Sequence, residues 1–272
     1  MIDPGTGLTV LGGAIGSKEL VQKILGPTAE YLGAGLAGWT ERAIKNTGRI
    51  FESAARKLGD QVDQPGAVPP KVLKGVLETA PFCDDQLGAE YFGGVLASSR
   101  SGIARDDRGS SFLSLLARLS TYQIRSHYVF YLAIQNLYAG VNENINVPEG
   151  RANLTTFVPM HSYASALKLA DGEDLNTILP HVLFGLSREA LIGETFRFGA
   201  TDHVKQAYPD AREAGIIWSP SVLGVELYLW AHGKGNAMAN DILVANTVPS
   251  LGIAINTTPG ICSVQLPDKK IG

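Results

Sequence analysis

Hydrophobic positions in the first half of the chain recur with the period of an α-helix. Across residues 41–58 the apolar side chains return every three to four positions, which predicts an amphipathic helix. A shorter pattern predicts a helix over 18–25, which Gly26-Pro27 closes. The other side of the 41–58 helix carries four cations around one acid: Arg42, Lys45, Arg49, Glu52 and Arg56.

Proline and acidic residues mark the limits of the next two helices. Pro69-Pro70 suits the first turn of a helix that Pro81 ends. Asp84 or Asp85 caps the following helix, over 87–99, because a carboxylate at this position accepts backbone N–H bonds. That helix is apolar or small nearly all round, so we expect it to be central.

Ser120 and Gln123 form a capping box that starts a helix running to Tyr138. This helix carries tyrosines on more than one face, among them Tyr122, Tyr128 and Tyr131. Tyrosine is favoured at interfaces, so these three residues are candidates for a surface that binds a partner. Core filling alone is the alternative. His127 lies among these rings, where we expect a hydrogen-bonded structural histidine.

After Gly140 the chain turns polar and its elements become shorter. Residues 141–159 include Pro148 and Gly150, which predicts a linker or a long loop. Two helices, two short strands and a closing helix are then predicted, in this order: 160–170, 174–186, 196–198, 216–218 and 222–231. This order is compatible with a winged-helix-like unit. Three β-rich runs follow Asn240: 242–245, 251–255 and 261–266.

These patterns predict a fold that is mainly α with a minor β component. A helical bundle body is followed by a small winged-helix-like α+β unit and a short β-rich C-terminal tail. The predicted parts are an apolar N-terminal segment, a helical domain, a linker, the α+β unit and the C-terminal extension, with the boundaries 1–16, 17–140, 141–159, 160–240 and 241–272.

The composition is ordinary for a soluble globular protein. The chain has 272 residues, of which 45% are hydrophobic and 18% charged, enough to bury one large core or two smaller ones. The net charge of −3 provides no overall attraction to nucleic acid or anionic membrane. The two cysteines, Cys83 and Cys262, lie far apart in the sequence, which favours a reducing compartment.

The cellular location that we expect for the protein depends on the apolar segment 1–16. Asp3 stands where a signal peptide needs a cation, and the segment is shorter than the roughly 20 apolar residues of a membrane span. We therefore expect a cytoplasmic protein. Peripheral contact with the inner membrane through this segment stays open as an alternative.

Motifs with catalytic or cofactor-binding letters lack the context that such chemistry requires. Gly33, Gly35 and Gly38 match a dinucleotide fingerprint, but the preceding residues predict helix where that site needs a strand, so we expect close helix packing. The five histidines show no metal-ligand spacing. His161-Ser162-Tyr163 has no nucleophile elbow around it. We predict no catalytic residue, no cofactor and no metal, and hence not an enzyme.

The cations Arg42, Lys45, Arg49 and Arg56 form what we call the cationic stripe. A solvated helix face is its simplest interpretation, and contact with a protein partner or lipid is the next. No aromatic residues are interleaved with these cations, so the base-stacking half of a nucleic-acid signature is missing and we expect no nucleic-acid partner.

In order and spacing, these signals resemble the Abi-alpha (abortive infection alpha) family of bacterial proteins. The residues that carry the resemblance are Gly26-Pro27, Arg56-Lys57-Leu58, Val68-Pro69-Pro70-Lys71-Val72-Leu73, Asp84-Asp85, Leu96-Ala97-Ser98-Ser99 and Ser111-Phe112-Leu113 with Leu119-Ser120. Residues 216–232 are similar to the family's C-terminal strand and helix. There Ser219-Pro220 and Gly224 depart from the family's Thr-Pro-x-Gly-like element by one substitution and one insertion.

The resemblance implies a helical antiphage-defence protein and transfers no active site. We expect it to act by binding, as a sensor, adaptor or regulator of an effector, with a co-encoded effector or a phage protein as its partner. The first alternative is a membrane-active effector that uses residues 1–16 and the Gly/Ala-rich helix over 26–39. The second alternative is a winged-helix protein that binds nucleic acid. A homo-oligomer also stays open.

Overall fold

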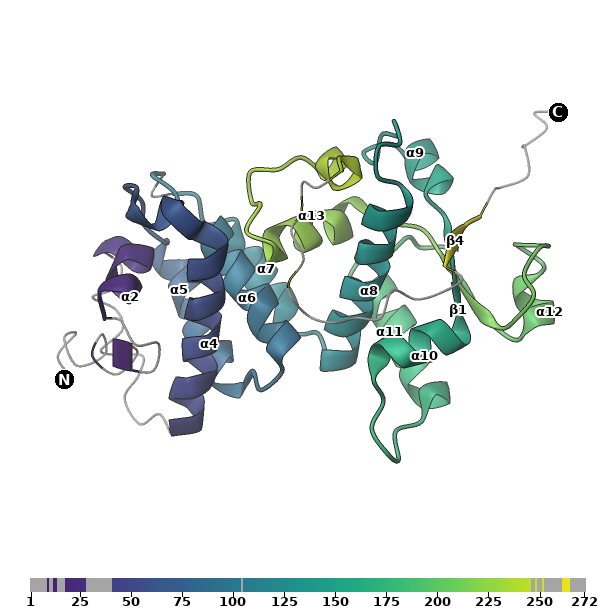
Figure 1. Ribbon diagram of the computed structural model, residues 1–272, viewed down its shortest axis with the longest axis horizontal. Helices are drawn as coiled ribbons and strands as arrows, with labels where there is room; N and C mark the ends of the chain where they lie inside the picture. Colours follow the sequence, from purple (N-terminus) through teal and green to yellow (C-terminus); the bar gives the residue numbers. More distant parts are fainter. Residues whose placement is uncertain are drawn as a thin grey trace. The chain divides into compact units, whose positions relative to one another are not determined.

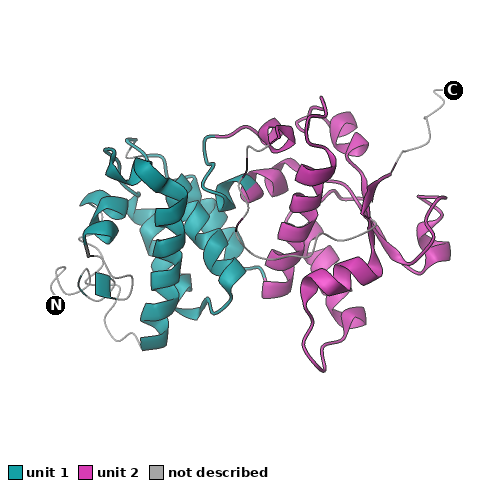
Figure 2. Ribbon diagram, viewed as in Figure 1, with its two compact units in different colours: residues 1–119, 229–236 teal, residues 120–228, 237–272 magenta. Residues whose placement is uncertain are grey.

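The computed structural model of the protein describes residues 9, 12–13, 18–27, 41–103, 105–245, 248, 251 and 261–264. The chain forms two compact units (Figure 2). Unit 1 comprises residues 1–119 and 229–236, and unit 2 comprises residues 120–228 and 237–272. The helices predicted over 18–25 and 41–58 are confirmed with these bounds, whereas most of segment 1–16, the glycines at 33–38 and the run 252–255 lie outside the described residues.

Unit 1 is helical (Figure 1), and its helix α6 packs against α4, α5 and α7. This unit contains the helices α2 (Lys18–Leu25), α4 (Glu41–Leu58), α5 (Pro70–Thr79), α6 (Gln86–Ser98) and α7 (Gly109–Leu116). The 3-10 turns η2 (Gly59–Asp63) and η3 (Ala80–Phe82) connect some of them. Asp85 caps α6 by accepting a hydrogen bond from the Gly88 amide at 2.8 Å. Helix α6 is buried from Leu87 to Ala97, as predicted.

Glycines let neighbouring backbones approach α6 closely. A Cβ atom added at Gly93 would lie 2.5 Å from the side chain of Ser53 on α4. At Gly94 it would lie 1.9 Å from the carbonyl oxygen of Ala231. The apolar, small-residue character of α6 therefore reflects contact on several sides, because a larger side chain has no room there.

Unit 2 combines helices with a small antiparallel sheet of strand order β2-β3-β1-β4 (Figure 1). The strands are β1 (Thr156–Pro159), β2 (Arg197–Gly199), β3 (Gly215–Trp218) and β4 (Cys262–Ser263). The remaining elements are α8 (Thr121–Leu137), α9 (Pro148–Asn153), α10 (Met160–Leu167), α11 (Leu175–Arg188), α12 (Thr201–Val204), α13 (Val222–Ala231, whose last three residues belong to unit 1) and η4 (Ala239–Leu243).

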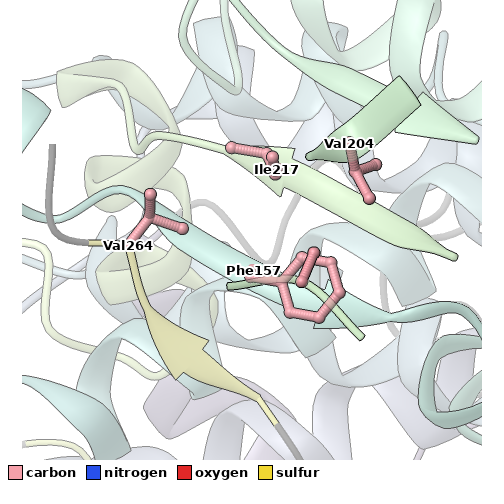
Figure 3. Close-up of a cluster of buried hydrophobic side chains, with 5 residues drawn as sticks. Phe157, Val204, Ile217 and Val264 are labelled. Carbon is pink, nitrogen blue, oxygen red and sulfur yellow. The ribbon is translucent and has the colours of Figure 1, made fainter. Parts of the chain in front are cut away.

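The two faces of the sheet are covered differently. In the β1–β3 pair Phe157 lies opposite Ile217, and these two residues pack with Val204 and Val264 on one face (Figure 3). The neighbouring Trp218 points to the other face because side chains alternate along a strand. There its ring stacks on Phe130 of α8, with 4.6 Å between the ring centroids.

The fold class is confirmed: the protein is mainly α with a minor antiparallel β component. The predicted strands near 196–198 and 216–218 appear as β2 and β3. The linker prediction for 141–159 is wrong in its second half, because this stretch contains α9 and the inner strand β1. All four residues of β1 are buried, so the alternating pattern that marks a strand is absent.

Two further predictions about the second half need correction. The run 242–245 is not a strand, since η4 occupies its first residues. The tail is not a separate extension either, because β4 pairs with β1. The compact units divide at residue 119 instead of 140, and the capping box at Ser120 starts the first helix of unit 2. The winged-helix comparison stays a prediction.

Candidate functional site

The cationic stripe on α4 is largely occupied by contacts within unit 1. Arg42 forms an ion pair with Asp84, and Arg56 with Glu90. Arg49 donates to the carbonyl oxygens of Cys83 and Asp84, both at 3.2 Å. Lys45 is exposed. These contacts connect α4 with the start and the first turns of α6, while the side chains of Arg42 and Arg56 stay 75% and 60% exposed.

A buried polar cluster lies beneath this stripe. The Ser53 hydroxyl donates to Glu90 at 2.8 Å and accepts from the ammonium group of Lys57 at 2.7 Å. Serine, lysine and a carboxylate are residue types of nucleophilic catalysis. However, Ser53 is fully buried among helices, so no substrate reaches its hydroxyl. The cluster is structural.

The predicted tyrosine surface is wrong for two of its three residues. Tyr128 and Tyr131 are buried in unit 2, with exposed fractions of 1% and 0%. Tyr122 is half-buried, and its hydroxyl binds the carboxylate of Glu173. The core-filling alternative therefore holds for Tyr128 and Tyr131, and His127 is buried with Nε2 at 3.0 Å from the Gly224 carbonyl oxygen.

His161, Ser162 and Glu213 form a chain of hydrogen bonds with the order of a serine–histidine–acid triad. Nδ1 of His161 lies 2.6 Å from the Glu213 carboxylate, and its Nε2 lies 3.2 Å from the Ser162 hydroxyl. Geometry of this kind is the first requirement for a general base. Ser162 is only 1% exposed, whereas His161 and Glu213 are open to solvent. Because a nucleophile must meet its substrate, we assign this chain to anchoring α10.

Unit 2 contains an open pocket of about 1080 Å³. Its floor is the apolar cluster on the sheet, since Ile217, Val264 and Ala207 line it. Its walls come from α9 and from two loop segments. Residues 187–197 run from the end of α11 to the start of β2, and residues 219–223 run from the end of β3 into the first turn of α13.

Tyr131 holds the two loops of this pocket together. Its hydroxyl donates to the Leu191 carbonyl oxygen at 2.7 Å and accepts from the Ser221 amide at 3.1 Å. Burial raises the pKa of Tyr131 to about 12, so the hydroxyl keeps its proton at neutral pH. Ser221 in turn caps α13 by accepting from the Gly224 amide and donates to the Ala190 carbonyl oxygen at 2.6 Å. A buried tyrosine therefore fixes the shape of the pocket.

Three arginines and one acid supply the charged lining of the pocket: Arg151, Arg188, Arg197 and Glu194. Arg151 donates to the Ile145 carbonyl oxygen at 2.7 Å, and Arg197 donates to Gln206 Oε1 at 2.6 Å. Within the described residues neither of these two arginines is paired with a carboxylate, whereas Arg188 contacts Glu189 at 3.3 Å. Arginine forks bind carboxylates and phosphates, so the lining fits an anionic ligand.

No protein-family model, no curated protein and no solved structure matches this chain. Among the residues that the structure describes, no group of three or more His, Cys, Asp or Glu side chains is placed to hold a metal ion. No helix within that part of the chain is both long and apolar enough to cross a bilayer.

Sequence reasoning missed the pocket because its arginines are widely spaced. Arg188 and Arg197 stand in a stretch with more acids than cations, and Arg151 lies in the segment predicted as a linker. Residues 219–223 gave one usable signal, since Ser219-Pro220-Ser221 announces the start of a helix. Only the antiparallel pairing of β1 and β3 brings the end of β3 beside α9 and the pocket floor.

Proposed function

We propose that this protein is a cytoplasmic antiphage-defence protein that acts by binding, and that unit 2 senses an anionic small molecule in the arginine-lined pocket. The resemblance to the Abi-alpha family supports the defence context. The observation that carries the binding role is that the pocket lining is cationic although unit 2 as a whole is acidic. Acidic residues outnumber basic ones in unit 2, yet the pocket lining holds three arginines and a single glutamate.

The chemistry of the pocket is that of recognition. Its floor is apolar, its lining supplies guanidinium groups, and the first turn of α13 adds the positive end of a helix dipole. Each charge-assisted hydrogen bond contributes about 1.5–3 kcal/mol to binding. A sensor of this kind passes the signal to a protein partner, which we propose to be a defence effector or a phage protein.

Calorimetric titration of the purified full-length chain with pyrophosphate tests the proposal. The double variant Arg151→Gln and Arg197→Gln should lower the affinity at least tenfold, because both guanidinium forks are lost. Arg212→Gln is the matched control, since Arg212 is exposed in unit 2 and does not line the pocket. Unchanged affinity in the double variant would overturn the proposal.

A plaque assay connects the pocket to defence. Cells that express the double variant should lose protection against phage, while cells that express Arg212→Gln keep it. If cells that express the double variant stay protected, the pocket is not required for defence against phage.

A further inference from the structure

We infer that the anionic ligand of unit 2 is a nucleotide, with its phosphates at the arginines and its base against Phe196. This inference rests on the proposed function and narrows its ligand class. Four observations carry it: the size of the pocket, an aromatic ring in the same lining as the cations, polar side chains in that lining, and the charge of the surrounding unit.

The size of the pocket exceeds what a small inorganic anion requires. A cavity of about 1080 Å³ lies just above the range of about 300–1,000 Å³ that is typical of pockets for ligands the size of drugs or cofactors. Phosphate or pyrophosphate alone would leave most of the apolar floor formed by Ile217 and Val264 uncovered. A ligand with a phosphate and a larger, flatter part would use both the rim and the floor.

An aromatic cluster reaches from the pocket to the surface. Phe196 lines the pocket, and its ring meets Phe184 edge to face with 5.4 Å between centroids. Phe198 completes the cluster, 6.3 Å from both other rings. Phe184 is 61% exposed, which is unusual for a phenylalanine. Stacking of a base on an aromatic side chain contributes about 1–3 kcal/mol.

Polar groups in the lining of the pocket suit a sugar and the edges of a base. The hydroxyl groups of Thr195 and Ser219 and the carboxylate of Glu194 belong to the lining. A carboxylate accepts hydrogen bonds from ribose hydroxyls or from exocyclic amino groups. Glu194 is therefore compatible with a nucleotide, whereas it would only weaken the binding of a bare phosphate.

The charge of unit 2 favours a single nucleotide over a polymer. Single-stranded nucleic acid needs a cationic groove that follows several phosphates. Acidic side chains outnumber basic ones in unit 2, so the cations of the pocket form an isolated patch. A strand of many nucleotides would meet repulsion beyond this patch.

Calorimetric titrations of the full-length protein with four probes test the inference: ribonucleoside triphosphates, pyrophosphate, ribose 5-phosphate and a single-stranded oligonucleotide. At least one nucleoside triphosphate should bind tenfold more tightly than pyrophosphate or ribose 5-phosphate. Phe196→Leu should weaken nucleotide binding about fivefold and leave pyrophosphate binding unchanged. Phe198→Leu is the matched control, because Phe198 belongs to the cluster but does not line the pocket.

The outcomes separate this inference from the proposed function. Equal affinity for pyrophosphate and nucleotides overturns the inference and leaves the anion-binding role standing. Absence of binding to every probe overturns both. If the oligonucleotide binds more tightly than every nucleotide, and this binding depends strongly on salt, the inference is overturned and the ligand is nucleic acid. If Phe196→Leu does not fold, the ranking of the probes on the wild-type protein decides.

Discussion

The ammonium group of Lys57 on α4 and the carboxylate of Glu90 on α6 form an ion pair almost removed from water. Their side chains are 8% and 7% exposed. Arg56 and the Ser53 hydroxyl also bind Glu90, so the carboxylate has partners on several sides. Removing one member of a buried pair leaves the other charge without compensation, which costs more than the pair itself contributes.

Replacement of Glu90 by leucine should therefore lower the free energy of unfolding by about 3–5 kcal/mol. The double replacement Lys57→Met with Glu90→Leu should recover a large part of this loss, because no buried charge remains. Urea denaturation followed by circular dichroism measures both values. If the double variant is no more stable than Glu90→Leu, the contributions of Lys57 and Glu90 to stability are not coupled.

The same carboxylate should make the stability of the protein depend on pH. Burial alone would raise the pKa of Glu90, but Lys57, Ser53 and Arg56 together outweigh it and hold this pKa below the usual value. A carboxyl group with a lowered pKa stabilises the fold above its unfolded pKa of about 4.3, and this contribution is lost as pH falls through the folded pKa.

We therefore expect the wild-type free energy of unfolding to fall below about pH 4.3. In Glu90→Gln this decline should be shallower, since the residue no longer titrates. Glu52→Gln, an exposed change on the same helix, serves as the control and should retain the wild-type slope. Equal slopes in all three proteins would contradict the prediction.

Tyr131→Phe tests whether the buried hydroxyl shapes the pocket. Its loss leaves the Leu191 carbonyl and the Ser221 amide without this partner, which should cost about 1–3 kcal/mol of stability. Pyrophosphate affinity should fall as well, because the two loops are no longer joined. Tyr122→Phe, whose hydroxyl lies on the surface beside Glu173, should change neither quantity by as much.

Gly94→Ala should be among the most damaging small substitutions in unit 1. The new methyl group would overlap the carbonyl oxygen of Ala231, which belongs to backbone and cannot rotate away. Overpacking of this kind costs about 1–3 kcal/mol, and an overlap with backbone lies at the upper end of this range. Gly102→Ala meets nothing within 4 Å and should leave the thermal midpoint near that of the wild type. Similar midpoints for both variants would show that α6 can shift.

The two parts of the cationic stripe should respond differently to alanine. Arg49→Ala removes the donor to the carbonyl oxygens of Cys83 and Asp84 and should lower the free energy of unfolding by about 1–2 kcal/mol. Lys45→Ala changes an exposed side chain and should stay within about 0.5 kcal/mol of the wild type. A destabilised Lys45→Ala would mean that this lysine has a structural role.

Local signals predicted the first half of this chain well. The limits of α4, the start of α5 after Pro69, the cap at Asp85 and the capping box at Ser120 all follow from chemistry within one turn of helix. The partners of the stripe could not be predicted, because Asp84 and Glu90 lie more than 30 residues from the cations that they bind.

The periodicity of this sequence determined by itself where most helices begin and end, since capping and amphipathic patterns act between neighbouring residues. Tertiary structure alone decided that Thr156–Pro159 is an inner strand, that Tyr131 is buried behind a pocket, and that Arg151 and Arg197 share its lining. These outcomes depend on strand pairing between segments some 60 residues apart, and no local pattern encodes such pairing.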